Sequence, residues 1–196
     1  WSRREKAHVF DSDPRNIIET TILTGTIVDK KQEFQFFETP LWLVDEMITL
    51  ANIVPGDIVL EPSAGSGRIV NRIRELYPDN KLICCELETS NYNSLVSNGF
   101  NVVENDFLRY EGKVDKIIAN PPFTRQQDID HITHMIEVCR EGGRIVTIAS
   151  VGITFRENKK TKAFRNLLES MGAYSIKKLP EGSFKAVSYT HLTLPT

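Results

Sequence analysis

Short apolar runs alternate with segments of helical periodicity along most of this chain. Apolar residues recur at helical spacing over 41–51, with Pro40 ahead of the first turn. Similar patterns predict helices over 67–77, 90–97, 128–140 and 160–171. Apolar runs between them predict strands over 57–60, 81–87, 100–103, 114–119, 144–149 and 174–179. Because strands that alternate with helices form a parallel sheet covered on both faces, we expect a doubly wound α/β fold.

The two ends of the chain differ from this pattern. Residues 1–35 are polar and weakly patterned, with at most a short strand or hairpin over 17–28, and the first residue is Trp1 rather than methionine, as in a fragment. The last ten residues, 187–196, resemble the translation of a transposon-end sequencing adapter. We therefore expect a polar segment over 1–35, one α/β domain over 36–186 and a non-native tail over 187–196.

The composition is typical of a globular protein, with 40% hydrophobic and 26% charged residues. No apolar run approaches the ~18 residues of a membrane span, and the chain starts without a signal-peptide pattern. Cys84, Cys85 and Cys139 lack metal-ligand spacing, so we expect buried free thiols in a reducing, cytoplasmic compartment. The net charge of −2 conceals a basic segment over 150–186, where eight Lys/Arg face three Asp/Glu. Such a cluster is either a solvated helix face or a contact for phosphate.

The segment Asn120-Pro121-Pro122-Phe123 follows the run 114–119, where a buried parallel strand would end. Ligands of open α/β sheets bind outside the carboxyl ends of the strands. The two prolines have no N–H and fix φ at about −65°, so the loop is stiff. These groups suit a planar substrate with an amino group, since the Asn120 oxygen and the Pro121 carbonyl accept its hydrogens while Phe123 stacks on its plane. The alternative is an ordinary turn with a core phenylalanine.

A second candidate site, Glu61-Pro62-Ser63-Ala64-Gly65-Ser66-Gly67, lies between the strand 57–60 and the next helix. Its glycines let the backbone approach a ligand and turn into that helix. Val70 replaces the third glycine of the dinucleotide fingerprint, and no Lys-Ser/Thr pair follows. Glu86 lies at the end of the next strand and Asp106 follows the strand after it, where carboxylates reach ribose hydroxyls and an adenine amino group. We therefore expect an adenosine ligand without a pyrophosphate.

Together these residues resemble the motifs of class I S-adenosylmethionine-dependent methyltransferases, and more narrowly of the enzymes that methylate adenine N6 in DNA. The segment Phe36-Phe37-Glu38-Thr39-Pro40 is similar to their cofactor motif, and its place before the glycine loop matches the gamma order. The resemblance extends over about 34–184 and includes 179–184 near the final strands. It implies a Rossmann-like methyltransferase fold with a mostly parallel sheet, S-adenosylmethionine as cofactor and DNA as substrate.

The resemblance also implies roles for individual residues. Thr39 would contact the methionine end of the cofactor, Glu86 its ribose and Asp106 its adenine. The whole cofactor set would be Thr39, Pro40, Glu61, Pro62, Ala64, Gly65, Gly67, Glu86 and Asp106. The catalytic set would be Asn120, Pro121, Pro122 and Phe123, and the nucleic-acid contacts Arg125, Arg156, Lys159 and Lys160. The sulfonium leaving group is already activated, so positioning suffices and no metal is expected.

Three interpretations of the function stay open. The first is a DNA adenine N6-methyltransferase. The second is an enzyme of the same fold that methylates an RNA base or a glutamine side-chain amide. The third is a non-catalytic cofactor-binding subunit or an inactive fragment. No segment is large enough for a target-recognition domain, so sequence specificity would either be relaxed or reside in a partner or in sequence lost from this chain.

Two further expectations concern the sheet edge and a histidine pair. The family ends its sheet in an antiparallel hairpin, and only the first strand of it fits before residue 187. We therefore expect the last strand to be missing and the sheet edge to be unpaired. His131 and His134 lie three residues apart on a predicted helix, which indicates a solvated helix face rather than a metal site, since two histidines do not complete one.

Overall fold

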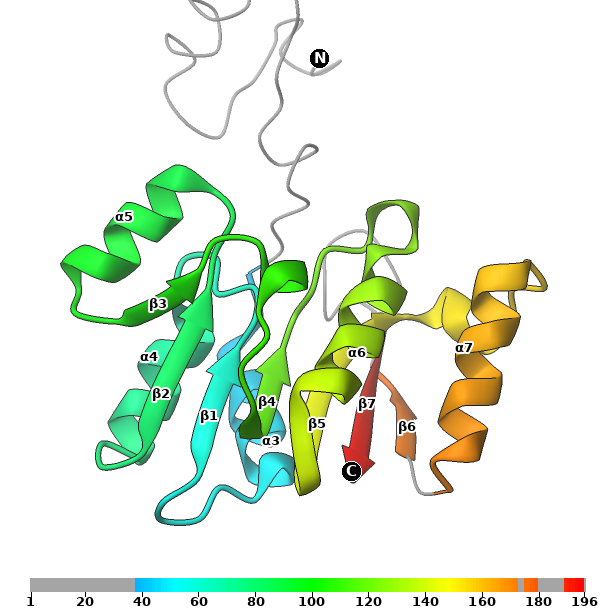
Figure 1. The fold of residues 1–196 in the computed structure, drawn as a ribbon, viewed down its shortest axis with the longest axis horizontal. Coiled ribbons are helices and arrows are strands. Elements are labelled where there is room, and N and C mark those ends of the chain that lie inside the picture. The colour runs from blue at the N-terminus through cyan, green and yellow to red at the C-terminus, as the bar shows by residue number, and fades with distance from the viewer. Residues whose placement is uncertain (1–37, 173–174, 180–188, 196) are drawn as a thin grey trace, which may run out of the picture. The chain divides into compact units, whose positions relative to one another are not determined.

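The computed structural model describes residues 38–172, 175–179 and 189–195, and within them a seven-stranded sheet is the centre of the fold (Figure 1). The strand order is β3-β2-β1-β4-β5-β7-β6. β1 to β5 are parallel, and β7 is antiparallel to both of its neighbours. The strands are β1 (Ile58–Glu61), β2 (Lys81–Cys85), β3 (Asn101–Glu104), β4 (Val114–Ala119), β5 (Cys139–Ser150), β6 (Ser175–Lys178) and β7 (Tyr189–Pro195).

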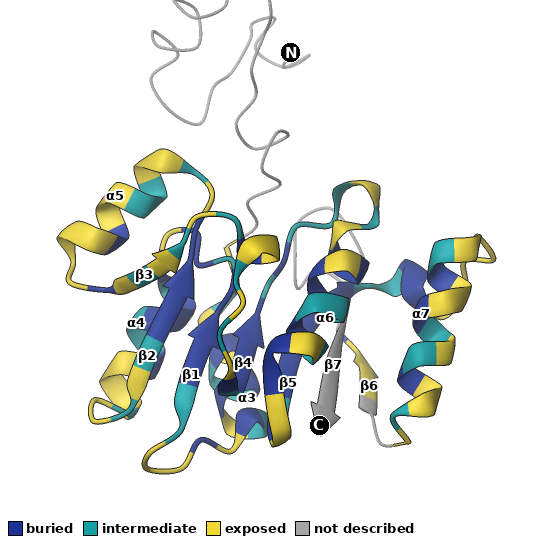
Figure 2. Ribbon diagram, in the orientation of Figure 1, coloured by how far each residue is buried: buried dark blue, intermediate teal, exposed yellow. Residues whose placement is uncertain are grey.

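Helices cover both faces of the sheet. The described α-helices are α3 (Leu41–Ala51), α4 (Arg68–Leu76), α5 (Thr89–Ser97), α6 (Gln127–Val138) and α7 (Lys159–Ser170). Apolar residues of α3 and α4 form one core cluster with Ile118 and Val146, whereas α6 and α7 form another with the alternate residues Ile117 and Ile145. This alternation follows from the two-residue period of a strand. The central strands are consequently buried on both sides (Figure 2).

The predicted elements between residues 41 and 178 are confirmed, most of them within one or two residues at each end. β5 differs, because it begins at Cys139, inside the predicted helix, and runs through Gly142 and Gly143. Cys139 is buried and pairs with Val114, and the register shifts between Val114 and Lys116. Gly142 has φ 75°, so the glycine pair forms an irregularity within the strand rather than a loop before it. The possible strand over 17–28 lies outside the described residues.

The expectation of a missing last strand is wrong. Residues 189–195, excluded from fold reasoning as a tail, form β7 between β5 and β6. β7 pairs with seven residues of β5, from Arg144 to Ser150, and with all four of β6. The sequence Tyr-Thr-His-Leu-Thr-Leu is rich in residues that favour strands, which explains why it fills the place beside β5. The origin of the tail stays a prediction.

The composition led to expectations about the cysteines and about membrane-spanning helices. Cys84, Cys85 and Cys139 are buried free thiols, as predicted, and burial raises the pKa of Cys84 and Cys85 to about 12. Both are therefore protonated and unreactive at neutral pH. Within the described part of the chain, no helix has both the length and the apolar character that a membrane crossing requires.

Candidate functional site

The glycine loop and the Asn120 loop leave the sheet side by side. β1 and β4 are parallel neighbours, with Leu60 opposite Ile117. Glu61 ends β1, Asn120 follows β4, and Glu86 follows β2 on the other side of β1. The sheet thus brings the predicted residues to one edge, as the common direction of parallel strands requires.

Residues 62–67 form a tight turn between β1 and α4. Gly65 and Gly67 have φ 54° and 83°, in the left-handed region that favours glycine. The Gly67 N–H donates to the Ala64 carbonyl (2.8 Å), and the Ala64 N–H donates to the Cys85 carbonyl at the end of β2 (3.0 Å). A Cβ on Gly67 would lie 2.9 Å from the Leu95 side chain. The loop is therefore closely packed at Gly67, and any other residue at Gly65 or Gly67 would have a strained backbone.

Glu61 lies beneath this loop and is only 2% exposed. Its Oε2 accepts from the Val70 N–H in the first turn of α4 (2.8 Å). Burial raises the pKa of Glu61 well above its usual range, with a further increase from the negative charge of Glu86. A carboxyl group in this environment favours the arrival of a positive charge, because the ionised form lacks solvent.

Glu86 connects the end of β2 to the glycine loop. Its Oε2 accepts from the Gly65 N–H (2.6 Å) and its Oε1 from the Glu88 N–H (2.8 Å). Burial raises its pKa, and these backbone hydrogen bonds oppose the rise. The next residue, Leu87, is 60% exposed. Sequence reasoning missed Leu87, although an apolar residue between two glutamates at a strand end was a usable signal.

Asp106 lies beyond the end of β3, next to the strand end that holds Glu86. The two segments are joined by a hydrogen bond from the Glu86 N–H to the Glu104 carbonyl (3.3 Å). Asp106 is half-buried and begins the short helix η1 (Phe107–Arg109), where its Oδ1 accepts from the Leu108 N–H (3.1 Å). The three predicted acidic residues therefore occupy three successive strand ends, β1, β2 and β3.

Thr39 and Asn120, which are 81 positions apart in the sequence, meet directly. The Asn120 Nδ2 donates to the Thr39 Oγ1 (3.1 Å). Thr39 is buried, and its carbonyl accepts from the Arg68 guanidinium (3.2 Å). The following Pro40 carbonyl accepts the first backbone N–H groups of α3. One buried side chain thus links the predicted cofactor segment to the predicted catalytic loop.

The Asn120 loop is partly embedded in the core. Pro121 is buried, and Phe123 is half-buried against the cluster that contains α3 and α4 residues. The loop continues into the short helix η2 (Thr124–Gln126), in which Arg125 and Gln126 have φ 52° and 64°. Positive φ values at two successive non-glycine residues are uncommon and occur preferentially at functional sites.

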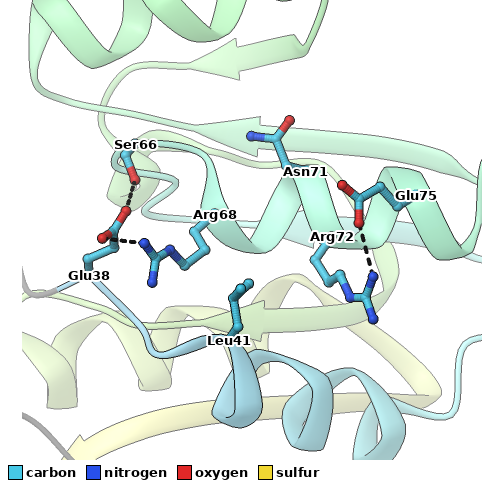
Figure 3. A pocket seen from close by; sticks show the side chains of 7 residues that line it. All are labelled: Glu38, Leu41, Ser66, Arg68, Asn71, Arg72 and Glu75. Atoms are coloured by element: carbon cyan, nitrogen blue, oxygen red, sulfur yellow. Dashed lines mark hydrogen bonds and ion pairs between the residues drawn. The ribbon is translucent and has the colours of Figure 1, made fainter.

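A pocket of about 320 Å³ adjoins the glycine loop on the side of α3 and α4 (Figure 3). At one end, Glu38 accepts from Ser66 Oγ (3.1 Å) and forms an ion pair with Arg68. These contacts attach the segment before α3 to the glycine loop. The pocket is lined by Glu38, Leu41, Ser66, Arg68, Asn71, Arg72 and Glu75.

The predicted basic cluster divides into paired and unpaired charges. Lys160 pairs with Asp130 (2.7 Å), and Lys162 and Arg165 both pair with Glu157 (2.9 and 3.1 Å). Within the described part of the chain, the exposed side chains of Arg125, Arg156 and Lys159 form no ion pair. Among the four predicted nucleic-acid contacts, the unpaired charges are therefore these three, which lie on segments that follow β4 and β5.

The expected solvated face for the two histidines is wrong, because α6 packs there against η1. His131 is 8% exposed and lies 5.5 Å from the Phe107 ring, between ring centroids. Burial lowers its pKa to about 4, so the ring is neutral at physiological pH. His134 contacts the Tyr110 carbonyl through Nε2 (2.8 Å) and Glu137 through Nδ1 (2.9 Å). Among the described residues, no group of three or more His, Cys, Asp or Glu could hold a metal ion.

A comparison with protein families matches residues 124–194 to the family model described as N-6 DNA Methylase. This region begins directly after Phe123. The match is consequently independent of the glycine loop and of Asn120, on which the resemblance in the sequence was based. It includes β5 to β7 and extends into the predicted tail.

Individual relatives agree with this match. The curated Modification methylase CviBIII of Paramecium bursaria Chlorella virus NC1A is 29% identical over 119 residues, covering 53% of this chain and 30% of that protein. A type I restriction-modification methyltransferase subunit from Streptococcus thermophilus superimposes with a TM-score of 0.71 at 19% identity, over 82% of this chain and 45% of its own. The EcoKI M protein of a type I restriction enzyme gives 0.69 at 18% identity, over 94% and 51%.

The chain spans 30% of the CviBIII methylase, 45% of the Streptococcus thermophilus subunit and 51% of the EcoKI M protein. At such low identity the solved structures establish the fold, which is the Rossmann-like fold of class I methyltransferases. In sequence, the chain is similar to the N6-adenine DNA methylases, as the motifs in residues 36–123 had indicated and the separate match over 124–194 supports.

Proposed function

We propose that this chain transfers a methyl group from S-adenosylmethionine to adenine N6 in DNA. The observation that supports this most is the hydrogen bond from Asn120 to Thr39, because it places the amide of the Asn-Pro-Pro-Phe loop against the cofactor motif. Both segments adjoin the glycine loop, with which Thr39 also interacts through Arg68. A cofactor-binding segment and an amine-binding loop side by side are what a methyl transfer to nitrogen requires.

The residues at the strand ends fit S-adenosylmethionine chemically. The cofactor has two positive centres, a carboxylate and a ribose diol, and it supplies a methyl group on an activated sulfonium. Glu61, with its raised pKa, favours a nearby cation. Glu86 would accept from the ribose hydroxyls, while Asp106 and the exposed Leu87 would bind and cover the adenine. Pro40, Pro62, Ala64, Gly65 and Gly67 would shape the backbone around the ligand.

Asn120 would act on the target amine through its side-chain oxygen. Because Nδ2 donates to Thr39, the acceptor end of the amide is turned away from Thr39. That oxygen and the Pro121 carbonyl would accept the two amine hydrogens and shift the nitrogen toward tetrahedral geometry, which frees its lone pair. Pro122 would keep the loop rigid, and Phe123, which is half-buried at the start of η2, would stack on the base.

Arg125, Arg156 and Lys159 would contact the phosphates of the nucleic acid, because their charges are uncompensated among the described residues. Lys160 would join them only where its pair with Asp130 opens. A subunit that reads the recognition sequence would be a further partner, since the Streptococcus thermophilus relative is the methyltransferase subunit of a type I restriction-modification system.

The test is transfer of a radiolabelled methyl group from S-adenosylmethionine, with unmethylated duplex DNA and total RNA as parallel acceptors. The proposal predicts label in DNA, recovered as N6-methyladenine after digestion to nucleosides. Label in RNA alone would contradict it and favour the RNA enzyme. Cofactor binding without label in either acceptor would point to a protein amide substrate or a non-catalytic subunit.

A matched pair of variants tests the assignment of the loop. Asn120→Ala should reduce transfer by about 10²-fold or more while cofactor affinity stays near that of the wild type, because the lost contact is to the target amine. Asn166→Ala, at an exposed position of α7, should change neither quantity. Equal losses of transfer and cofactor affinity in Asn120→Ala would show that the loop is misassigned.

A further inference from the structure

The turn after β5 presents an aromatic ring to solvent beside the candidate site. Phe155 follows the short helix η3 (Val151–Thr154), and its side chain is 63% exposed, more than any other large apolar side chain in the described residues. Its sequence neighbours Arg156, Glu157 and Asn158 are exposed and polar. Single exposed apolar residues are common on protein surfaces, so only the surroundings of the Phe155 ring can indicate whether it is part of a binding site.

The backbone that carries Phe155 is held rigidly. The Arg156 N–H donates to the Gly152 carbonyl (3.0 Å). The Arg165 guanidinium, from α7, donates to the carbonyls of Ile153 and Arg156 (3.2 and 2.7 Å). The ring is thus exposed on a turn that is anchored on both sides of it. Pre-organisation of this kind reduces the entropy lost when a ligand stacks on the ring.

This turn is attached to the segment that follows Asn120. Gln126 donates to the Thr161 hydroxyl in the first turn of α7 (3.2 Å). Asp128, in the first turn of α6, accepts from the Ser150 N–H at the end of β5 (2.9 Å). Both contacts tie the loop after β4 to the chain around Phe155, and η3 and α7 lie beside α6 in Figure 1. The ring consequently belongs to the same edge of the sheet as the Asn120 loop.

Three cations lie on segments that adjoin Phe155 in the chain or are attached to its turn. Arg156 is its neighbour in the chain, Lys159 begins α7, and Arg125 lies in the attached turn after β4. None of the three forms an ion pair within the described part of the chain. An exposed aromatic ring among uncompensated cations is the combination with which proteins hold unpaired nucleotides, through stacking on the base and attraction to the phosphate.

We propose that Phe155 stacks on an unpaired base of the nucleic acid, next to the adenine that enters the Asn120 site. The inference rests on the proposed function, since a base must leave the duplex before its amino group can reach Asn120. Phe155 then stabilises the opened strand, whereas Phe123 contacts the target base itself. Arg156 binds the adjoining phosphate, so ring and charge contribute separately.

The experiment compares binding of the full chain to two single-stranded oligonucleotides of equal length. One carries bases and the other is abasic, so that both have the same phosphates. The wild type should prefer the oligonucleotide with bases, and stacking on Phe155 should contribute about tenfold to this preference. Phe155→Ala should reduce the preference by that factor, and Phe155→Trp should keep it. Fluorescence anisotropy gives the affinities, and thermal melting confirms that the variants are folded.

Two control variants separate stacking from other effects. Arg156→Ala should weaken binding to both oligonucleotides by the same factor, because it removes a phosphate contact. Leu76→Ala, exposed at the end of α4, should change neither affinity. Unchanged binding in Phe155→Ala, or an equal loss on both oligonucleotides, overturns the proposal.

Failure of the proposed function gives a different result. If the wild type transfers no methyl group to DNA and the base preference falls in Phe155→Ala, the methylation proposal fails and the stacking proposal stands. If the wild type methylates DNA and Phe155→Ala keeps the base preference, the stacking proposal alone fails.

Discussion

Substitution of Gly67 by alanine tests whether the glycine loop needs both its conformation and its close packing. Gly67 has φ 83°, and a Cβ there would lie 2.9 Å from Leu95 Cδ2 and 3.2 Å from Asn71 Nδ2. Leu95 is buried, and Asn71 donates to the Gly67 carbonyl (2.7 Å), so neither side chain moves without loss. Gly99 has a similar φ of 76° but nothing within 4 Å of the added Cβ, which makes Gly99→Ala the matched control.

The two variants share one penalty and differ in another. An alanine in the left-handed region costs about 1–2 kcal/mol at either position. Overpacking against buried side chains adds roughly 1–3 kcal/mol, and only Gly67→Ala has such neighbours. The free energy of unfolding should therefore fall by about 1–2 kcal/mol in Gly99→Ala and by about 2–5 kcal/mol in Gly67→Ala.

Urea unfolding of the two variants measures this difference. Because one kcal/mol shifts the melting temperature of a chain of this size by about 2–4 °C, thermal melting should separate them by roughly 2–12 °C. Cofactor affinity should fall in Gly67→Ala alone, since Gly99 lies after α5 and away from the loop. Equal destabilisation of the two variants would refute the claim that close packing, in addition to backbone conformation, selects glycine at 67.

Three further predictions concern single side chains. Since burial raises the pKa of Glu61, its contribution to stability is greatest below the pKa of the unfolded state and is lost as pH rises through the folded pKa. In urea unfolding from about pH 4 to 8, Glu61→Gln should therefore lose less stability with rising pH than the wild type. Parallel stability curves for the two proteins would count against this prediction. Asp128→Ala should lose about 1–3 kcal/mol because the Ser150 N–H loses its acceptor, whereas Asp128→Asn should lose less in the same assay. Lys159→Ala should lower the slope of log affinity for DNA against log salt concentration by about one. Lys160→Ala should lower it by less, because Lys160 is paired with Asp130. Equal slopes in the two variants would refute the division of the basic cluster into paired and unpaired charges.

Most of the fold could be predicted from the sequence because its signals are local. The apolar residues of 41–51 repeat at helical spacing, and the helix α3 has the predicted bounds. The run 114–119 has no helical periodicity and forms β4 as predicted. β7 was missed for a different reason, since its residues were set aside on grounds of origin rather than of pattern. The pairing of β7 with β5 joins residues that are 39 to 51 positions apart, which periodicity alone does not show.

The candidate site was predictable only as far as strand topology determines it. Parallel strands bring Glu61, Glu86 and Asn120 to one edge whatever their side chains do. The partners of those side chains depend on packing between distant segments, as the contact between Asn120 and Thr39 illustrates. His131 was misread for the same reason, because the helical pattern of α6 does not reveal that η1 covers it.

The basic segment shows that the charge counted from the sequence differs from the charge that stays unpaired in the folded chain. The segment 150–186 has a surplus of five positive charges by count. In the folded chain, Glu157 takes up two of these cations, and Lys160 meets Asp130 from α6, 30 positions earlier. Arg125, outside the basic segment, joins the cations that stay available. The electrostatic attraction of this edge for phosphate therefore depends on which carboxylates the helices bring near the cations. Removal of Asp130 should strengthen nucleic-acid binding, although Asp130 lies on α6 and Lys160 on α7.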